Sequence, residues 1–286
     1  MKKIKPSLFV FLTAAIILQY GCSERQLSPI KGSLKCYVDE SLYNVVKAER
    51  DTFAVLYVES NIVLEVVKAR EGIASVLNGE ANMFVSSRNL NDEETAFAKK
   101  HVPDMRSFKF CYDAVIPIVR ENDSKNEITL DEIKKILKGE KSGYKVFVPE
   151  RNSGVYEYLK ENLLDNQEFI NVSIVQSEEE TIAKVKATKN SLGFVGLNTL
   201  ANVTGVKMLE VGSKVRSDGE VLYYKPYVAY LVSKTYPLLR TTTIFINEFG
   251  IGLASGFSTF MTSYQGQKIV SQNNLGPATV PIKMVY

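Results

Sequence analysis

The stretch that decides the fold runs from Tyr144 to Leu164 and reads Tyr-Lys-Val-Phe-Val-Pro-Glu-Arg-Asn-Ser-Gly-Val-Tyr-Glu-Tyr-Leu-Lys-Glu-Asn-Leu-Leu. Its β-branched and aromatic residues predict a strand over 144–148. Apolar residues at helical spacing predict a helix over 156–164. The short turn between them, Arg151-Asn152-Ser153-Gly154, leaves unpaired N–H groups at the start of the helix. Such groups favour an anion.

Three residues of this turn could contact an anion. Arg151 offers a planar fork for two oxygens, and Ser153 offers a hydroxyl. Gly154 has no side chain, so a ligand could approach its backbone closely. The alternative is an ordinary capped helix, with Asn152 or Ser153 at the N-cap and Arg151 in solvent. The turn alone is compatible with both interpretations.

The chain before this turn alternates strands and helices. We predict strands at 34–38, 55–58 and 83–85, with helices from Ser41, over 62–77 and from Asn91. This order indicates an α/β fold with a mainly parallel sheet, whose ligands bind beyond the carboxyl ends of the strands. Polar clusters follow the three predicted strands, so we expect one shared site edge, formed by Ser41, Ser60, Ser87 and Arg88.

The turn and the order of later motifs resemble the phosphate-binding proteins of ABC importers. Arg151, Ser153 and Gly154 match the family's anion turn, Ser191–Gly196 its glycine-rich strand, and Tyr236–Arg240 its Tyr-Pro-Leu-x-Arg segment. The resemblance spans Gly32 to Tyr286. It implies a two-lobed periplasmic-binding-protein type II fold, in which each lobe is a mixed, mainly parallel sheet flanked by helices and two crossover strands, 108–119 and 221–232, join the lobes. Lobe 1 would comprise 34–113 with 228–286, and lobe 2 would comprise 114–227.

The resemblance also implies a ligand and a partner. A monomer would hold phosphate or a similar inorganic oxyanion between Ser41, Ser60, Ser87 and Arg88 of one lobe and Arg151, Ser153 and Gly154 of the other. It would deliver the anion to ABC permease subunits.

Two positions depart from the family pattern: Val155 replaces a Thr, and Arg88 replaces an Asp that accepts the phosphate proton. Asp39, Glu40 or Glu59 could replace that acceptor. Sulfate is an alternative ligand, and a surface lipoprotein acting as sensor or adhesin is an alternative function.

The amino terminus predicts export. Lys2, Lys3 and Lys5 precede a short apolar run, which is typical of a signal peptide, here residues 1–21. Cys22 closes this run as in bacterial lipoproteins, so we expect a lipid on Cys22 and a tether over 22–33. The protein would then be anchored to a membrane and face the periplasm or the cell exterior. A plain signal peptide or an uncleaved anchor is the alternative.

Composition excludes several classes of function. Removal of the three signal lysines takes the formal net charge of +3 to about neutral, so no nucleic-acid partner is expected. The single histidine, His101, excludes a His-rich metal site and has no catalytic motif around it. We therefore expect no enzyme and no cofactor. Cys36 and Cys111 lie in predicted strands, where buried free thiols are favoured over a disulfide.

Overall fold

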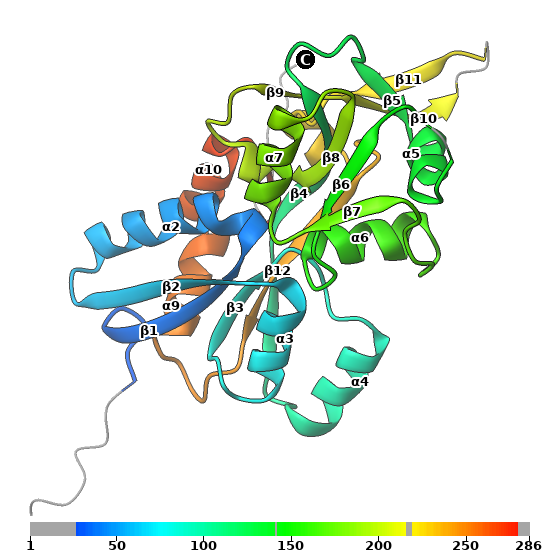
Figure 1. Cartoon of the computed structure of the whole chain (residues 1–286). Coiled ribbons are helices and arrows are strands. Elements are labelled where there is room, and N and C mark those ends of the chain that lie inside the picture. Colours follow the sequence, from blue (N-terminus) through cyan, green and yellow to red (C-terminus); the bar gives the residue numbers. More distant parts are fainter. Residues whose placement is uncertain (1–26, 141, 216–218, 280–286) are drawn as a thin grey trace, which may run out of the picture.

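The computed structural model describes residues 27–140, 142–215 and 219–279. Figure 1 shows two lobes, each a sheet flanked by helices, that meet at the middle of the molecule. The long strand β4, Arg106–Arg120, belongs to both sheets: residues 106–114 pair with β12 and 115–118 with β8. The predicted two-lobed α/β fold is therefore confirmed.

The sheet of the first lobe has the strand order β2-β1-β3-β12-β4. β1 pairs in parallel with both β2 and β3, whereas β12 is antiparallel to β3 and β4. The short strand β13 also pairs with β4. The strands beside β4 are β1 (Gly32–Asp39), β2 (Ser60–Val67), β3 (Met83–Ser86), β12 (Leu239–Ile246) and β13 (Gly276–Pro277).

The sheet of the second lobe continues from β4 in the order β8-β6-β7, with β9 also paired to β4. β6 runs parallel to both β7 and β8. A small separate sheet has the order β11-β10-β5. The strands of this lobe are β5 (Glu127–Thr129), β6 (Lys145–Pro149), β7 (Val172–Val175), β8 (Ser191–Gly196), β9 (Val206–Met208), β10 (Glu210–Val215) and β11 (Val221–Tyr224).

Helices cover both sheets. They are the short turn η2 (Glu40–Leu42), α2 (Tyr43–Leu56), α3 (Ala69–Leu77), α4 (Asp92–His101), α5 (Leu130–Leu137), α6 (Gly154–Leu163), α7 (Glu178–Ala187), η3 (Asn198–Leu200), α8 (Val228–Val232), α9 (Leu253–Thr262) and α10 (Tyr264–Gln272). Capping boxes are present at Asn91, where a helix start was predicted, and at Thr129. In each, the side chain of the cap and a Glu three residues later satisfy N–H groups at the helix start.

Two predicted elements near the start of the chain are wrong. Residues 55–58, predicted as a strand, include the last turn of α2, which ends at Leu56. The predicted helix over 62–77 is instead β2 followed by α3. The run of β-branched residues in β2 favours a strand beside β1, and this pairing overrides the helical spacing of its apolar residues.

The return crossover over 221–232 is also not one strand. β11 stays in the small sheet of the second lobe, and the chain then passes through 225–227 into the short helix α8. Ser41 does not cap α2, since Leu42 holds the N-cap position and Ser41 lies inside η2.

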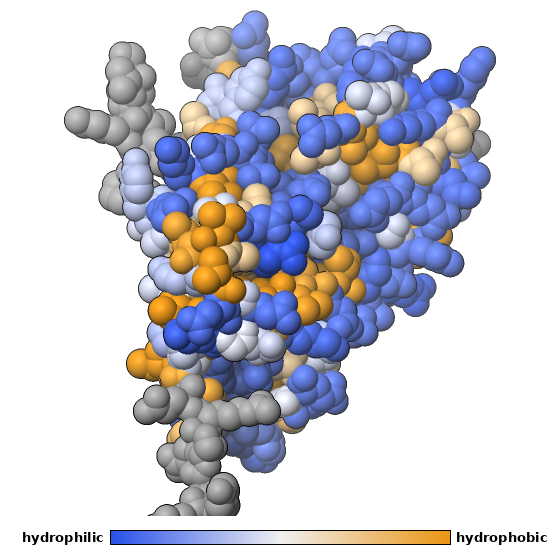
Figure 2. Space-filling view, turned by 90° about the vertical axis from the view of Figure 1, so that its left-hand side faces the viewer, coloured by the Kyte–Doolittle hydropathy of each residue, from blue (hydrophilic) through white to orange (hydrophobic). Residues whose placement is uncertain are grey.

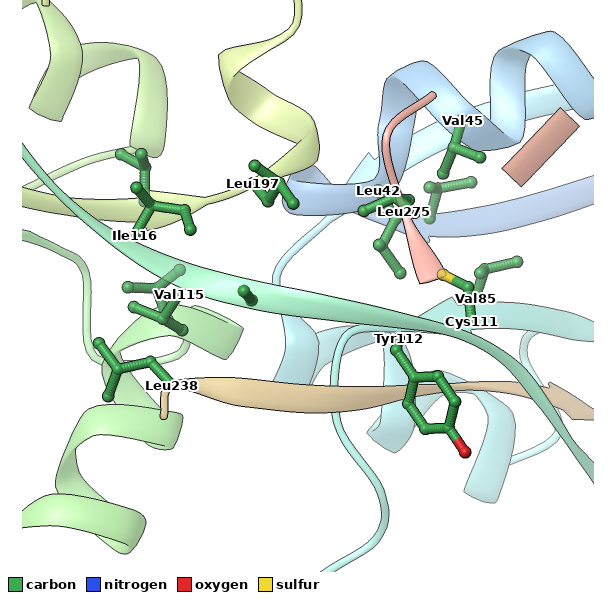
Figure 3. Close-up of a cluster of buried hydrophobic side chains, with 14 of the residues drawn as sticks. Leu42, Val45, Val85, Cys111, Tyr112, Val115, Ile116, Leu197, Leu238 and Leu275 are labelled. Carbon is green, nitrogen blue, oxygen red and sulfur yellow. The ribbon is translucent and has the colours of Figure 1, made fainter. Parts of the chain in front are cut away.

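One apolar core runs through both lobes along β4. Figure 3 shows part of it, with Leu42 and Leu275 on one side of the junction and Val115 and Leu238 on the other. Cys36 and Cys111 are buried in this core as free thiols, as expected. No helix among the described residues is long and apolar enough to cross a membrane. Cys22 and residues 1–21 lie outside these residues.

Candidate functional site

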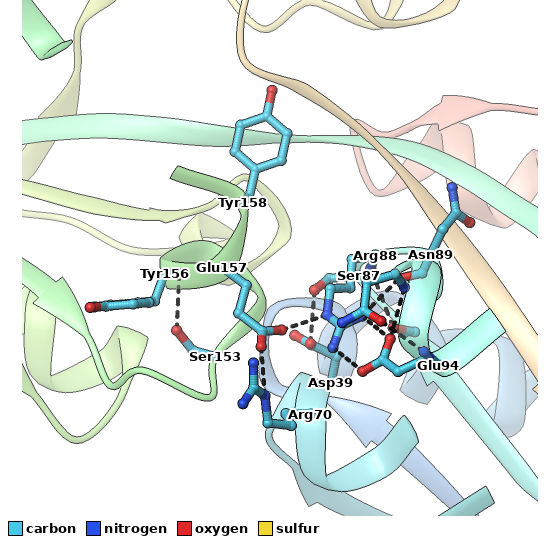
Figure 4. Close-up of polar contacts among 12 residues, drawn as sticks. Asp39, Arg70, Ser87, Arg88, Asn89, Glu94, Ser153, Tyr156, Glu157 and Tyr158 are labelled. Atoms are coloured by element: carbon cyan, nitrogen blue, oxygen red, sulfur yellow. Dashed lines mark hydrogen bonds and ion pairs between the residues drawn. The ribbon is translucent and has the colours of Figure 1, made fainter. Parts of the chain in front are cut away.

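The two lobes touch where β3 of one meets the start of α6 of the other. A Cβ added to Gly154 would lie 1.8 Å from Ser87 Oγ and 3.0 Å from Asp39 Oδ2. Ser87 Oγ also donates a 2.8 Å hydrogen bond to Asp39 Oδ2. Gly154 therefore allows this close approach, because an added methyl group would displace either the Ser87 side chain or the lobes. We call this contact the crevice; it is drawn in Figure 4.

The start of α6 has the capped geometry expected of it. Ser153 is the N-cap and is buried, and its Oγ accepts a 3.2 Å hydrogen bond from the N–H of Tyr156. The backbone N–H groups of the first turn and the positive end of the helix dipole face the lobe junction at Gly154. The structure thus shows the capped helix that was the alternative interpretation of this turn, and an anion site at this helix start stays a prediction.

Arg88 lies beside the crevice in a network of ion pairs. Its Nε donates a 2.5 Å hydrogen bond to Glu157 of α6, and its Nη1 and Nη2 bind the two carboxylate oxygens of Glu94. Nη1 also donates to the carbonyl of Asn89. A guanidinium has five N–H donors, so these four bonds leave one for another partner. Four of the five N–H donors of Arg88 are thus taken up by protein groups.

Glu157 is the acid that links the lobes at this point. It accepts from Arg88 and, at 2.9 Å, from Nε of Arg70, both of which belong to the first lobe. Burial raises the pKa of Glu157, while the two arginines act in the opposite direction. The carboxylate therefore partly neutralises the cations at the crevice.

A second contact between the lobes surrounds Glu178 at the start of α7. This fully buried carboxylate accepts hydrogen bonds from the Ser41 hydroxyl, the Gly196 N–H at 2.7 Å and the Thr199 hydroxyl at 2.5 Å. Burial raises its pKa. Three donors converging on one carboxylate show that this corner of the junction can hold a negative charge.

Arg240 contributes a buried positive charge to the same corner. Its Nε donates at 2.8 Å to Asp113 Oδ2, which binds together the neighbouring strands β4 and β12. Gly196 leaves room for the guanidinium, since a Cβ there would lie 2.5 Å from Nη2. Among the described residues Nη1 of Arg240 has no hydrogen-bond partner.

Lys68 closes the far side of the junction. It follows β2 and its Nζ reaches Glu40 at 2.7 Å and the carbonyl of Gln176 at 2.8 Å, so it joins both lobes. Burial raises the pKa of Glu40 to about 8, with the nearby charge of Glu178 acting in the same direction and Lys68 against it.

The structure brings together five of the seven predicted anion ligands. Ser41, Ser87, Arg88, Ser153 and Gly154 lie at the junction of the lobes. Ser60 does not, because it begins β2 rather than ending a strand, and its hydroxyl bonds to the carbonyl of Tyr57. Lys68 stands where β2 does end.

Arg151 also lies outside the crevice. Its side chain is 73% exposed, and its nearest ionic partner is Glu168, 3.9 Å away. The side chain of Arg88 is only 9% exposed and pairs with other acids. The expectation that the two guanidinium groups converge on one ligand is therefore wrong.

Sequence reasoning missed Glu157, Glu178, Lys68 and Arg240. Of these four, only Arg240 appears in the sequence analysis, as the last residue of the Tyr-Pro-Leu-x-Arg segment. Only the packed structure could show that their charges meet.

Two mixed sheets that share one long strand, with strand ends and helix starts facing across one junction, define a two-lobed α/β protein. A family model described as the PBP superfamily domain matches residues 23–265. The chain therefore belongs to the PBP superfamily, a family of binding proteins.

Individual relatives are similar to this chain over most of its length. The phosphate-binding protein PstS of Borreliella burgdorferi is 27% identical over 298 residues, covering 95% of this chain and 97% of its own. Protein SphX of Synechococcus elongatus is 24% identical over 274 residues, covering 87% of this chain and 79% of its own. Among solved structures, one is described as a putative phosphate ABC transporter substrate-binding protein with bound phosphate from Clostridium perfringens. Its sequence is 20% identical to this chain. It has a TM-score of 0.74 and covers 86% of this chain and 100% of its own.

Proposed function

We propose that this protein captures an inorganic oxyanion, with phosphate the first candidate, outside the cytoplasm and delivers it to an ABC importer. The observation that carries the proposal is the crevice itself, where the start of α6 faces Ser87 across the lobe junction. Helix-start N–H groups and hydroxyls are suited to a small oxyanion. The names of the relatives and the phosphate bound to the Clostridium protein support phosphate.

We assign the ligand contacts to Ser41, Ser87, Ser153 and Gly154, with Arg88 supplying positive charge. Ser87 and Gly154 are in direct contact, so the lobes must part to admit an anion between them. A hinge motion at the crossover strands would allow this. Closure around the anion would then exclude water, which strengthens each hydrogen bond to it. This role needs neither catalysis nor a cofactor.

The anchor and the lobe boundaries belong to the same proposal. Cys22 would carry a lipid and hold the protein at the outer side of a membrane, as a monomer that reaches permease subunits. Residues 34–113 with 228–286 would form one rigid lobe and 114–227 the other. Mass spectrometry of the protein purified from membranes tests the lipid, which adds a fixed mass to an N-terminal peptide beginning at Cys22.

Isothermal titration with phosphate and with sulfate tests the anion. We expect heat with phosphate, and weaker or no heat with sulfate. Clear binding of sulfate without phosphate binding would reassign the ligand.

One observation favours a second candidate, a surface lipoprotein that acts as a sensor or adhesin. Glu94 and Glu157 already accept hydrogen bonds from three of the five donors of Arg88. Their negative charges therefore offset the positive charge of Arg88 at the crevice. Under this alternative neither anion produces heat. The same titration therefore separates the two functions.

A further inference from the structure

A patch of exposed apolar side chains surrounds the point where the chain enters the first lobe. Phe249 is 92% exposed and Ile251 66% exposed, both in the loop between β12 and α9. Val58, which precedes β2, is 85% exposed, and Leu27 and Ile30 are also exposed. We call these five residues the entry patch. Exposed apolar residues that gather in one place indicate an interaction surface.

Contacts connect the segments that carry the entry patch. Leu27 Cδ1 lies 3.1 Å from where a Cβ on Gly250 would be, so Leu27 covers the loop that carries Phe249. A cavity of about 340 Å³ is lined by Ile30, Ile251 and Tyr57, the residue before Val58. Figure 1 places the first residues of the described chain beside this loop, at the lower left of the molecule. Figure 2 shows apolar residues among hydrophilic ones on the face seen from that side.

The chain is fixed to the lobe from its first described residues. A Cβ added to Gly256 in α9 would lie 1.7 Å from the carbonyl oxygen of Pro29, so Pro29 packs on the helix backbone. Gly32 already begins β1. The tether expected over 22–33 is thus held against the lobe from 27 on. Cys22 is five residues before Leu27, a stretch that spans at most about 18 Å when extended.

Three charged residues near the patch have partners within the protein. The carboxylate of Glu248 accepts hydrogen bonds from the N–H groups of Gly252, Ala254 and Ser255, at 3.0–3.2 Å. Lys31 and Glu59 pair with each other at 2.7 Å. The acids next to the exposed aromatic ring are therefore engaged within the protein.

We propose that the entry patch rests on the bilayer to which Cys22 is anchored. This inference depends on the lipid anchor of the proposed function, but not on the anion. A short connection keeps the patch within reach of the lipid surface, and aromatic and aliphatic side chains at a loop tip suit the interfacial region. β1 separates the patch from the crevice by its full length, about 26 Å for eight residues. Contact with the bilayer therefore leaves the crevice accessible.

The absence of tryptophan from the chain gives a direct test. The full chain is produced with its lipid as Phe249→Trp, and the matched control is Tyr227→Trp on the second lobe, whose native side chain is 58% exposed. Each protein is placed in phosphatidylcholine–phosphatidylglycerol vesicles, with and without brominated lipids. We expect the emission of the Phe249→Trp variant to shift to shorter wavelength and to be quenched by bromine, and the emission of the control to do neither.

Three results would overturn the proposal. Equal emission and quenching of the two variants, with the lipid present on Cys22, would mean that the patch does not meet the bilayer. A shift that appears without vesicles and grows with protein concentration would assign the patch to a second copy of the chain. A Cys22 without lipid would remove the anchor. Phosphate titration of the same samples reports separately on anion capture.

Discussion

Replacement of Gly154 by alanine perturbs the crevice by a single methyl group. The added Cβ would lie 1.8 Å from Ser87 Oγ, whereas an ordinary contact needs about 3.5 Å, so the two lobes must separate by about 1.7 Å. Alternatively Ser87 rotates and leaves the buried Asp39 oxygen without its 2.8 Å hydrogen bond. Either response costs about 1–3 kcal/mol.

An anion bound between Ser87 and α6 would approach the backbone of Gly154, where this methyl group now stands, so we expect a similar cost in the phosphate-bound form. At about 1.4 kcal/mol per tenfold change, the Kd for phosphate should rise roughly 5- to 150-fold. The midpoint of thermal unfolding without ligand should change little, since each lobe keeps its own packing. Isothermal titration and thermal unfolding of the same sample measure both quantities.

The matched control is Asn152→Ala, which changes the same turn at an exposed residue and adds nothing to the crevice. It should bind phosphate like the unaltered protein. A Gly154→Ala variant that also binds phosphate with unchanged Kd would refute the reasoning, because the anion would then bind without approaching the backbone of Gly154.

Two further predictions concern single side chains. Arg151→Ala should leave the Kd for phosphate unchanged within twofold, because its side chain is 73% exposed. Ser87→Ala should raise that Kd about tenfold through loss of one hydrogen bond to a charged group. Titration of both variants with phosphate checks this, and a large effect of Arg151→Ala would contradict the proposed site. Glu49 of α2 is buried, neither carboxylate oxygen has a partner among the described residues, and burial raises its pKa from 4.5 to about 9. Between these pH values the folded chain holds more protons than the unfolded chain, so stability falls as pH rises. Glu49→Gln should remove up to about 3 kcal/mol of this loss of folding stability at pH 7. Thermal unfolding should show a higher midpoint for the variant at pH 8 and little change at pH 5. An equal effect at both pH values would exclude ionisation of Glu49 as the cause.

Much of the second lobe could be predicted from the sequence. The strand, turn and helix from Tyr144 to Leu164 appear almost as expected, because a β-branched run and a Ser-Gly turn are strong local signals. The capping boxes at Asn91 and Thr129 also follow from residues only three positions apart. Where the determining contacts are local, the sequence is sufficient.

The errors have a common physical origin in contacts between distant residues. β2 forms because its run pairs with β1, and no local pattern reveals that pairing. This single misassignment moved Ser60 to the predicted site edge. Arg151 was assigned to the ligand from its place in a motif, but the turn directs its side chain toward Glu168. The acids Glu157 and Glu178 became part of the site only when the lobes packed together.

The central claim is that an oxyanion binds between Ser87 and the start of α6, and a crystal structure of the protein grown with phosphate tests it most directly. Our account predicts one phosphate within hydrogen-bond distance of Ser87 and of Ser153 or Gly154, with Ser60 and Arg151 making no contact. Phosphate bound at Arg151 on the surface, or a crevice that stays closed at saturating phosphate, would contradict it.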